Sequence, residues 1–119
     1  MEVASNYMAN RIQTAIENCN VDELMSCYTE DAEIKVVDRD HPPSRPLEIR
    51  GKDNLKAFFS DVCNREMTHN IDMEIVDADH LAYTESCQYK DGTRVLSANM
   101  CELKNGRIAK ETIVQAWDA

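Results

Sequence analysis

The chain has 119 residues, of which 43% are hydrophobic and 29% are charged, and its formal net charge is −9. This composition is ordinary for a folded domain and excludes wholesale disorder. The negative charge disfavours nucleic acids and anionic membrane surfaces, because both would repel the protein. We therefore expect one domain over residues 1–119 that binds neither nucleic acid nor a membrane.

The apolar runs are far shorter than the roughly 18 residues that a membrane-spanning helix needs. The N-terminus, MEVASNYMAN, lacks the basic and apolar regions of a signal peptide. Five cysteines are scattered along the chain without a C-x-x-C pair, which is typical of buried, reduced thiols. We expect a cytoplasmic protein. With three glycines, no phosphate-binding motif and no metal-ligand spacing of histidines, we expect neither a cofactor nor a metal.

The first half of the chain has helical periodicity. Between residues 3 and 18, apolar side chains recur at one-turn spacing, at Met8, Ile12, Ala15, Ile16 and Cys19. Asn20 or Asp22 can cap a second, short helix containing Leu24, Met25 and Tyr28. A third helix is predicted over residues 52–65, with Leu55, Phe58, Phe59 and Val62 on one face.

Strands alternate with turns in the remaining segments. Ala32, Ile34 and Val36 predict a first strand, and three prolines make residues 38–46 irregular. Further strands are predicted around residues 71–75 and over 81–90, 93–104 and 107–117. Asp91-Gly92 and Asn105-Gly106 are strong hairpin signals that join the last three into a meander. Helices followed by strands predict an α+β fold, with three helices packed in the concave side of a curved, mostly antiparallel sheet.

The register of the hairpins predicts which side chains share the concave face. We expect Lys90 to pair with Thr93, and Lys104 with Arg107, as in two-residue turns. The interior side chains are then Tyr83, Glu85, Cys87, Leu96, Ala98, Met100, Glu111, Ile113, Gln115 and Trp117. The predicted ligand pocket consists of Val36, Phe58 and the members of this set other than Glu85 and Glu111.

Two carboxylates, Glu85 and Glu111, lie inside in this register. Close, buried carboxylates raise one another's pKa, which suits a general acid or base. The alternative is a β-bulge that shifts one strand and turns a glutamate to solvent. The opposite sheet face mixes apolar and polar groups, and a homodimer stacked sheet to sheet would cover it.

Three stretches carry a family resemblance: NVDELMSCYTEDAEI, IRGKDNLKAFF and ELKNGRIAKETIVQAWD. They resemble the second-helix junction, the third helix and the final hairpin of the SnoaL-like branch of the nuclear transport factor 2-like superfamily, which includes ketosteroid isomerases. The resemblance implies a cystatin-like α+β cone with a pocket, and a homodimer through the outer sheet face. It implies no single activity, because this superfamily hosts isomerases, hydrolases, cyclases and non-catalytic binding domains.

The ketosteroid isomerase residues are mostly missing. The tyrosine of the first helix corresponds to a position near Ile12, and the base aspartate to one near Val36 or at Asp38. The second acid falls near Met100, with Asn99 as the alternative one residue away. Steroid isomerisation is therefore doubtful, whereas the pocket is still expected.

The remaining candidates each have a structural alternative. Asp38, at the rim of the cone, is a candidate base or a solvated loop acid. His41 lies in the proline loop. His69 shares parity with Ile71, Met73 and Ile75, so it is a candidate inward-pointing pocket or core residue. Tyr83 and Trp117 suit a ring-shaped ligand or ordinary packing, and Cys87 has no evident base beside it.

Two functions follow from these residues. The first is binding of a small hydrophobic or mixed-polarity molecule with proton-transfer catalysis of the isomerase, cyclase or hydrolase type, through Glu85, Glu111 or Asp38. The second is a non-catalytic ligand-binding or homodimeric interaction module.

Overall fold

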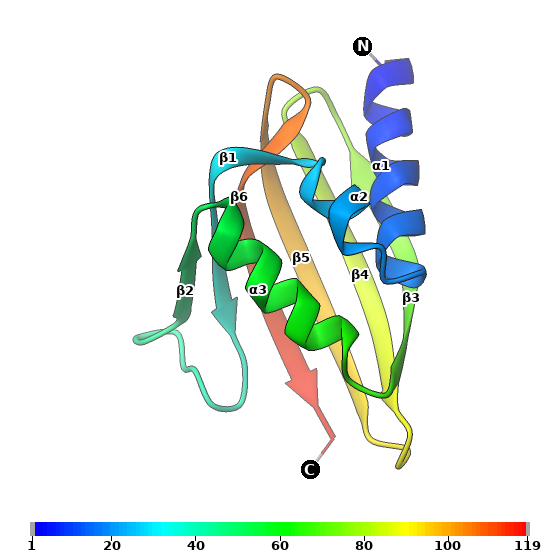
Figure 1. Ribbon diagram of the computed structural model, residues 1–119, viewed down its shortest axis with the longest axis vertical. Coiled ribbons are helices and arrows are strands. Elements are labelled where there is room, and N and C mark those ends of the chain that lie inside the picture. Colours follow the sequence, from blue (N-terminus) through cyan, green and yellow to red (C-terminus); the bar gives the residue numbers. More distant parts are fainter. Residues whose placement is uncertain (1, 119) are drawn as a thin grey trace.

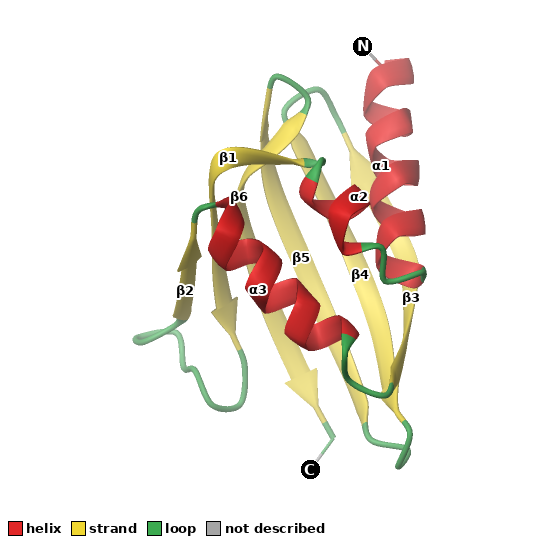
Figure 2. Ribbon diagram, viewed as in Figure 1, coloured by secondary structure: helices red, strands yellow, loops and turns green. Residues whose placement is uncertain are grey.

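The computed structural model describes residues 2–118, with side chains from residue 8 onward. Its elements are α1 (Glu2–Glu17), α2 (Val21–Met25), β1 (Tyr28–Val37), β2 (Leu47–Arg50), α3 (Lys52–Cys63), β3 (Met67–Val76), β4 (His80–Tyr89), β5 (Arg94–Lys104) and β6 (Arg107–Trp117). Figures 1 and 2 show the helices on one face of a curved sheet. The predicted α+β architecture is confirmed.

The sheet has the strand order β2-β1-β6-β5-β4-β3. The pair β1–β6 is parallel, and the other neighbouring strands are antiparallel. The edge strand β2 has no counterpart among the predicted strands. It begins directly after Pro46, and an edge position tolerates the neighbouring prolines because a central ladder is not interrupted. The proline loop is therefore the connection of a β1–β2 hairpin.

The predicted apolar stripes face the core to different extents. Met8, Ile12 and Ile16 of α1 are buried, whereas in α3 Leu55 is buried and Phe58 and Phe59 are partly buried against the core. Asn20 caps α2, since its side chain accepts a hydrogen bond from the backbone N–H of Glu23 at 3.1 Å. Within the described chain no helix is both long and apolar enough to cross a membrane.

Tyr28 does not belong to the second helix, contrary to expectation. Helix α2 ends at Met25, and Tyr28 is the first residue of β1. Its side chain is fully buried, and its ring lies 5.8 Å from that of Phe59 on α3. The regular alternation begins at Ala32, because Glu30 is exposed and the pairing of β1 with β6 shifts between Tyr28 and Glu33, so alternation alone does not place Tyr28 in the core.

The turn at Asn105-Gly106 has the predicted form. Lys104 pairs with Arg107, and both central residues have positive φ, 53° for Asn105 and 77° for Gly106. This is the geometry of a type I′ turn, which matches the twist of the flanking strands.

The predicted register at Asp91-Gly92 is wrong by one residue. The N–H of Tyr89 donates to the carbonyl of Thr93 at 2.8 Å, and the N–H of Gly92 donates to the carbonyl of Tyr89 at 3.0 Å. The loop therefore contains three residues, and Gly92 takes a φ of 96° at its last position. A three-residue loop of this kind places glycine where the chain needs positive φ.

A second irregularity lies in the next hairpin. The register of β5 and β6 shifts between Glu102 and Leu103, so that Cys101, and not Met100, is opposite Glu111. Each shift moves the pairing of β5 by one residue, one against β4 and one against β6. The inner side chains of β4 and β6 are therefore the predicted ones, whereas the side chains of β5 lie on the face opposite to the predicted one.

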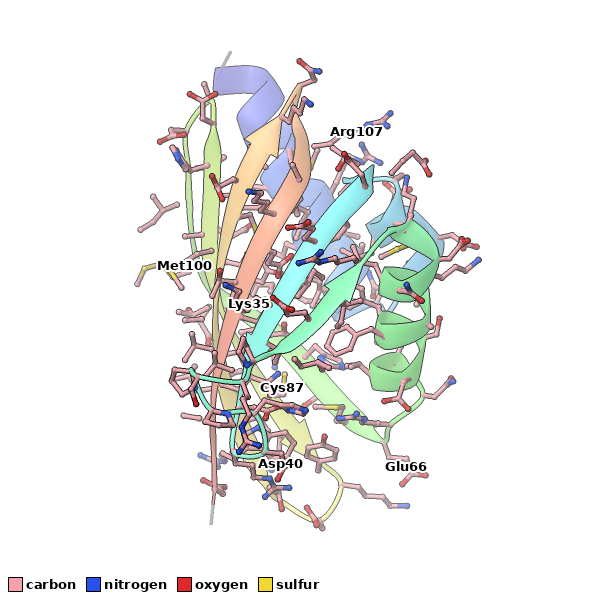
Figure 3. All side chains as sticks on the ribbon, turned by 90° about the vertical axis from the view of Figure 1, so that its left-hand side faces the viewer. Lys35, Asp40, Glu66, Cys87, Met100 and Arg107 are labelled. Atoms are coloured by element: carbon pink, nitrogen blue, oxygen red, sulfur yellow. The ribbon has the colours of Figure 1, made fainter. Side chains whose placement is uncertain are left out.

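The inversion moves three predicted pocket residues to the outside. Leu96 is 52% exposed and Met100 is 50% exposed, and Ala98 lies between them in sequence on the same outer face of β5. Figure 3 shows Met100 on the side of the sheet away from the helices. Val95, Ser97, Asn99 and Cys101 take the inner positions, and all four are buried.

Candidate functional site

An interior cavity lies between the helices and the concave face of the sheet. Its volume is about 80 Å³, and its lining combines apolar side chains of α1, α2 and α3 with inner residues of β3–β6. A cavity of this size holds several water molecules or a small ligand group. Two clusters of buried polar side chains flank it, one around Glu111 and one around Glu85.

The cluster around Glu111 is a closed hydrogen-bond network. The hydroxyl of Tyr28 donates to one carboxylate oxygen of Glu111. The other oxygen accepts from the amide nitrogen of Asn99 at 2.9 Å and from the hydroxyl of Tyr83 at 3.4 Å. The hydroxyl of Ser97 donates to the amide oxygen of Asn99 at 2.8 Å. Both carboxylate oxygens therefore have donors, as a buried carboxylate requires.

Burial raises the pKa of Glu111 above its usual range, and the hydrogen bonds from Tyr28, Asn99 and Tyr83 lower it again in part. Only 3% of the residue is exposed. The pKa values of Tyr28 and Tyr83 lie well above their usual range, first because of burial and then because of the nearby Glu111 charge. Both phenols are therefore neutral donors at ordinary pH. Tyr83 and Asn99 line the cavity, whereas Glu111 lies behind them.

The second cluster joins β3 and β4. Nδ1 of His69 lies 2.7 Å from Oε2 of Glu85, and the thiol of Cys87 donates to the same oxygen at 3.1 Å. The side chains are 5% exposed for His69 and 13% exposed for Glu85. Nε2 of His69 is buried and has no hydrogen-bond partner among the described residues. A buried ring nitrogen without a partner is uncommon, and it is a ligand-binding or catalytic signal.

Sheet pairing brings the second cluster together. His69 and Cys87 are directly opposite each other on β3 and β4, and Glu85 lies two residues from Cys87 on the same strand face. All three line the cavity. Burial, followed by the charge of Glu85, raises the pKa of the Cys87 thiol, so Cys87 is not a ready nucleophile.

The cavity continues into a wider mouth with a volume of about 570 Å³. Its lining includes Asp38 and His41 of the proline loop, together with Tyr89 and Trp117. The rings of Tyr89 and Trp117 are 5.7 Å apart, and the guanidinium of Arg39 lies 4.2 Å from the Trp117 ring. Figure 3 shows Asp40, from the same loop, at the same end of the molecule as Glu66. The mouth is thus a polar rim around a flat aromatic wall.

Asp38 lies at this rim, where the first strand gives way to the loop. One of its carboxylate oxygens accepts from the backbone N–H groups of Asp40 and His41, both at 2.9 Å, and lies 2.8 Å from Nδ1 of His41. Burial raises the pKa of Asp38, but these hydrogen bonds outweigh it and bring the pKa below its usual value. The side chain therefore organises its own loop.

The other predicted pocket residues divide between the two spaces. Tyr83, Cys87 and Ile113 line the interior cavity, and Val36 lines the mouth. Residues shared by both spaces are Phe58, Gln115 and Trp117. The prediction did not include Ser97 and Asn99, because their strand was assigned to the wrong face. His69 points inward as predicted, but Met73 and Ile75, which share its parity, are exposed because the pairing of β3 with β4 shifts between Ile71 and Met73.

Residues 9–111 match the SnoaL-like domain family. The chain belongs to this family. No curated protein matched the sequence. The SnoaL-like chain also resembles solved structures at low sequence identity.

A candidate ketosteroid isomerase from Kribbella flavida is 14% identical, with a TM-score of 0.79, over 95% of this chain and 77% of its own. An NTF2-like protein of unknown function from Burkholderia xenovorans is 20% identical, with a TM-score of 0.80, over 98% of this chain and 84% of its own. A candidate polyketide cyclase from Sinorhizobium meliloti is 17% identical, with a TM-score of 0.69, over 89% of this chain and 92% of its own. These likenesses establish an NTF2-like fold and nothing finer.

The positions related to ketosteroid isomerases now have definite surroundings. Ile12 and Val36 are buried apolar residues of this SnoaL-like domain. Asn99, and not Met100, faces inward, and its amide nitrogen lies 3.2 Å from the Tyr83 hydroxyl.

Proposed function

We propose that this SnoaL-like protein binds a small, partly apolar carbonyl compound in its cone and moves a proton on it, with His69 as the general base. The observation that supports this role is the state of the imidazole. Glu85 holds one ring nitrogen of His69 at 2.7 Å, the residue lines the cavity, and its other ring nitrogen is buried without a hydrogen-bond partner among the described residues. A carboxylate that accepts the Nδ1 proton leaves the Nε2 lone pair for substrate.

The proposed step is abstraction of a proton from the carbon next to a carbonyl. The C–H electron pair passes into an enolate, and the proton goes to Nε2 of His69. Glu85 stabilises the imidazolium that forms. In an isomerisation the same nitrogen returns the proton to another position. In a cyclisation the enolate carbon attacks a second carbonyl carbon of the substrate, the π bond of that carbonyl breaks, and its oxygen takes the proton back from Nε2 of His69.

Gln115 is the proposed partner of the substrate oxygen. Its amide oxygen accepts a hydrogen bond from the indole nitrogen of Trp117 at 3.1 Å. This contact orients the amide and directs its NH₂ group to the ligand as a donor, at the junction of cavity and mouth. A donor at this place stabilises the charge that develops on an enolate oxygen.

The dimensions of the site favour a reacting group that is small and a remainder that is flat. The interior of about 80 Å³ accepts little more than a short acyl group. The mouth offers the Tyr89 and Trp117 rings to a planar portion. The names of the Kribbella and Sinorhizobium proteins, a candidate isomerase and a candidate cyclase, agree with the proposed reaction types.

The other two predicted acids receive supporting roles in this proposal. Glu111 is enclosed by its three donors and holds Tyr83 and Asn99 in place. Asp38 shapes the loop at the mouth. Neither carboxylate is the proposed base.

The test is deuterium exchange from D₂O into 2-tetralone, a flat ketone, followed by NMR in the presence of a chelator. We expect His69→Gln and Glu85→Gln to slow exchange by about 10²-fold or more. His80→Gln is the matched control, because His80 also contacts a carboxylate, that of Asp77, but lies exposed at the start of β4. If the protein binds 2-tetralone but exchange equals that of buffer, the non-catalytic binding module is correct. Equal rates in all variants would also refute the role of His69.

We also propose a homodimer through the outer face of the sheet. The large exposed apolar side chains are Met73, Ile75, Leu96, Met100 and Val114. All five belong to β3, β5 and β6 on the face opposite the helices. A second copy would remove this apolar surface from water. Light scattering should give twice the mass of one chain for the parent protein. The double variant Leu96→Lys/Met100→Lys should give the mass of a single chain. Asp53→Lys, on the exposed side of α3, is the control and should stay dimeric.

Five free thiols support a reducing location, and we propose the cytoplasm. Fusion of the protein to a fluorescent reporter tests this directly. Fluorescence confined to a membrane or an exported fraction would refute it.

A further inference from the structure

We propose that His69, Glu85 and Cys87 form a binding site for a zinc-class divalent metal ion. The trio presents one nitrogen, one oxygen and one sulfur, and the three donor atoms all lie within 4.8 Å of one another. This donor set suits borderline metals such as Zn²⁺ and Co²⁺. Hard cations such as Mg²⁺ and Ca²⁺ prefer oxygen ligands and do not fit it.

The spacing of two donors already agrees with tetrahedral coordination. Zn–S bonds of about 2.3 Å and Zn–N bonds of about 2.0–2.1 Å place the two donors about 3.5 Å apart in a tetrahedron. Sγ of Cys87 and Nδ1 of His69 are separated by 3.5 Å. These two residues are directly opposite each other on paired strands, so the sheet sets their separation.

Glu85 supplies the third donor and is the residue that must move. Its Oε2 lies 2.7 Å from Nδ1 of His69 and 3.1 Å from Sγ of Cys87, at hydrogen-bond distances. Tetrahedral coordination requires separations of about 3.3–3.5 Å. A displacement of the Glu85 carboxylate by about half an ångström, through rotation of its flexible side chain, gives these donor separations. The metal then takes the place of the protons in these hydrogen bonds.

Charge in the interior also favours a cation. Glu85 lines the cavity with a side chain that is 13% exposed, and the buried Glu111 lies behind the cavity wall with neutral donors only. Near Glu85 the available partners are an imidazole and a thiol. A divalent ion would compensate both the carboxylate and a Cys87 thiolate.

All three ligand residues line the cavity, so the proposed site has its fourth coordination position on that side. A site with three protein ligands and an open position leaves room for water or a ligand. The inference does not rest on the proposed proton transfer. A metal on Nδ1 displaces the proton that Glu85 accepts, so the metal-bound and proton-transfer forms are separate states, and the exchange assay contains a chelator.

The experiment is calorimetric titration of the chelator-treated full chain with Zn²⁺, joined to Co²⁺ absorption spectroscopy. We expect one ion per chain, intense tetrahedral cobalt bands and a sulfur-to-cobalt charge-transfer band. Cys87→Ser should remove that band, and Cys87→Ser and Glu85→Gln should each weaken binding by about 100-fold. Mg²⁺ should produce no heat of binding.

Cys27→Ser is the matched control, because Cys27 is buried away from the trio and donates to a backbone carbonyl, as a serine hydroxyl also can. Circular dichroism checks the fold of every variant, and Zn²⁺ should raise the melting temperature of the parent chain. Absence of stoichiometric binding by the parent chain would overturn the site. A cobalt complex without the sulfur band, or the same loss in Cys27→Ser, would overturn it too.

Discussion

Glu85 and Glu111 both lie on the concave side of the sheet, yet their surroundings differ. Glu111 receives hydrogen bonds from two tyrosines and an asparagine, and these groups separate it from the cavity. Glu85 lines the cavity beside His69, whose second ring nitrogen has no partner within the described chain. Glu111 thus belongs to a network in which both carboxylate oxygens have donors, whereas the network of Glu85 contains a His69 nitrogen without a partner among the described residues.

This difference distinguishes a polar network that stabilises the fold from one that serves a ligand. A satisfied buried network holds the fold together, and removal of its centre leaves several donors unpaired. An unsatisfied one lowers stability and is retained where a ligand completes it. Each prediction below tests this distinction by changing one network while the other stays intact.

The largest effect is expected for Glu111→Ala. The change leaves the donors of Tyr28, Tyr83 and Asn99 without their acceptor. We expect the free energy of unfolding to fall by about 3–5 kcal/mol in urea denaturation. Glu102→Ala on the exposed side of β5 is the control and should change it by less than about 0.5 kcal/mol. A loss as small as that of the control would show that the network is not stabilising.

The opposite sign is expected for the double variant His69→Phe/Glu85→Leu. Apolar groups replace a buried polar pair of similar shape that has an unpartnered nitrogen. We expect thermal and chemical unfolding to give an unchanged free energy or a gain of about 1–2 kcal/mol. His69→Phe alone leaves the Glu85 carboxylate with only the Cys87 thiol as a donor and should be destabilising. A loss of more than about 2 kcal/mol in the double variant would make this cluster structural as well.

Glu111→Gln tests the network through pH. The pKa of Glu111 is raised in the folded state by burial, so the folded protein binds this proton more tightly than the unfolded chain does. Its contribution to stability is therefore greatest below the usual glutamate pKa and is lost as pH rises toward the raised pKa. Unfolding curves over this window should show a steeper decline for the parent than for Glu111→Gln. Parallel curves would contradict the assigned pKa direction.

The smallest effect is expected at the mouth, for Asp38→Asn. The pKa of Asp38 is lowered, because the hydrogen bonds in its loop outweigh burial. Its stabilisation is present above the usual aspartate pKa and is lost as pH falls through the lowered value. We expect a cost of about 0.5–1 kcal/mol at neutral pH that shrinks in acid. The proton exchange of 2-tetralone should persist, and its loss would instead make Asp38 a participant in the chemistry.

Local pattern in the sequence was enough to predict most elements and two inner strand faces. Helical periodicity located the buried stripe of α1, and alternation placed Tyr83, Glu85 and Glu111 on the concave side. The family likewise follows from three short stretches, spread over residues 20–118, each of which carries its own local pattern. These features depend on neighbours in sequence, because side-chain period and turn chemistry are local properties.

Tertiary structure alone decided the face of β5 and the composition of both polar clusters. A three-residue loop at Gly92 and a register shift beside Leu103 each move the pairing by one place, and together they bring Asn99 inside and turn Met100 out. The meeting of His69 with Cys87, and of Tyr28 with Glu111, depends on pairing between strands. One-residue shifts depend on packing across the whole sheet, and the sequence of a single strand does not encode them.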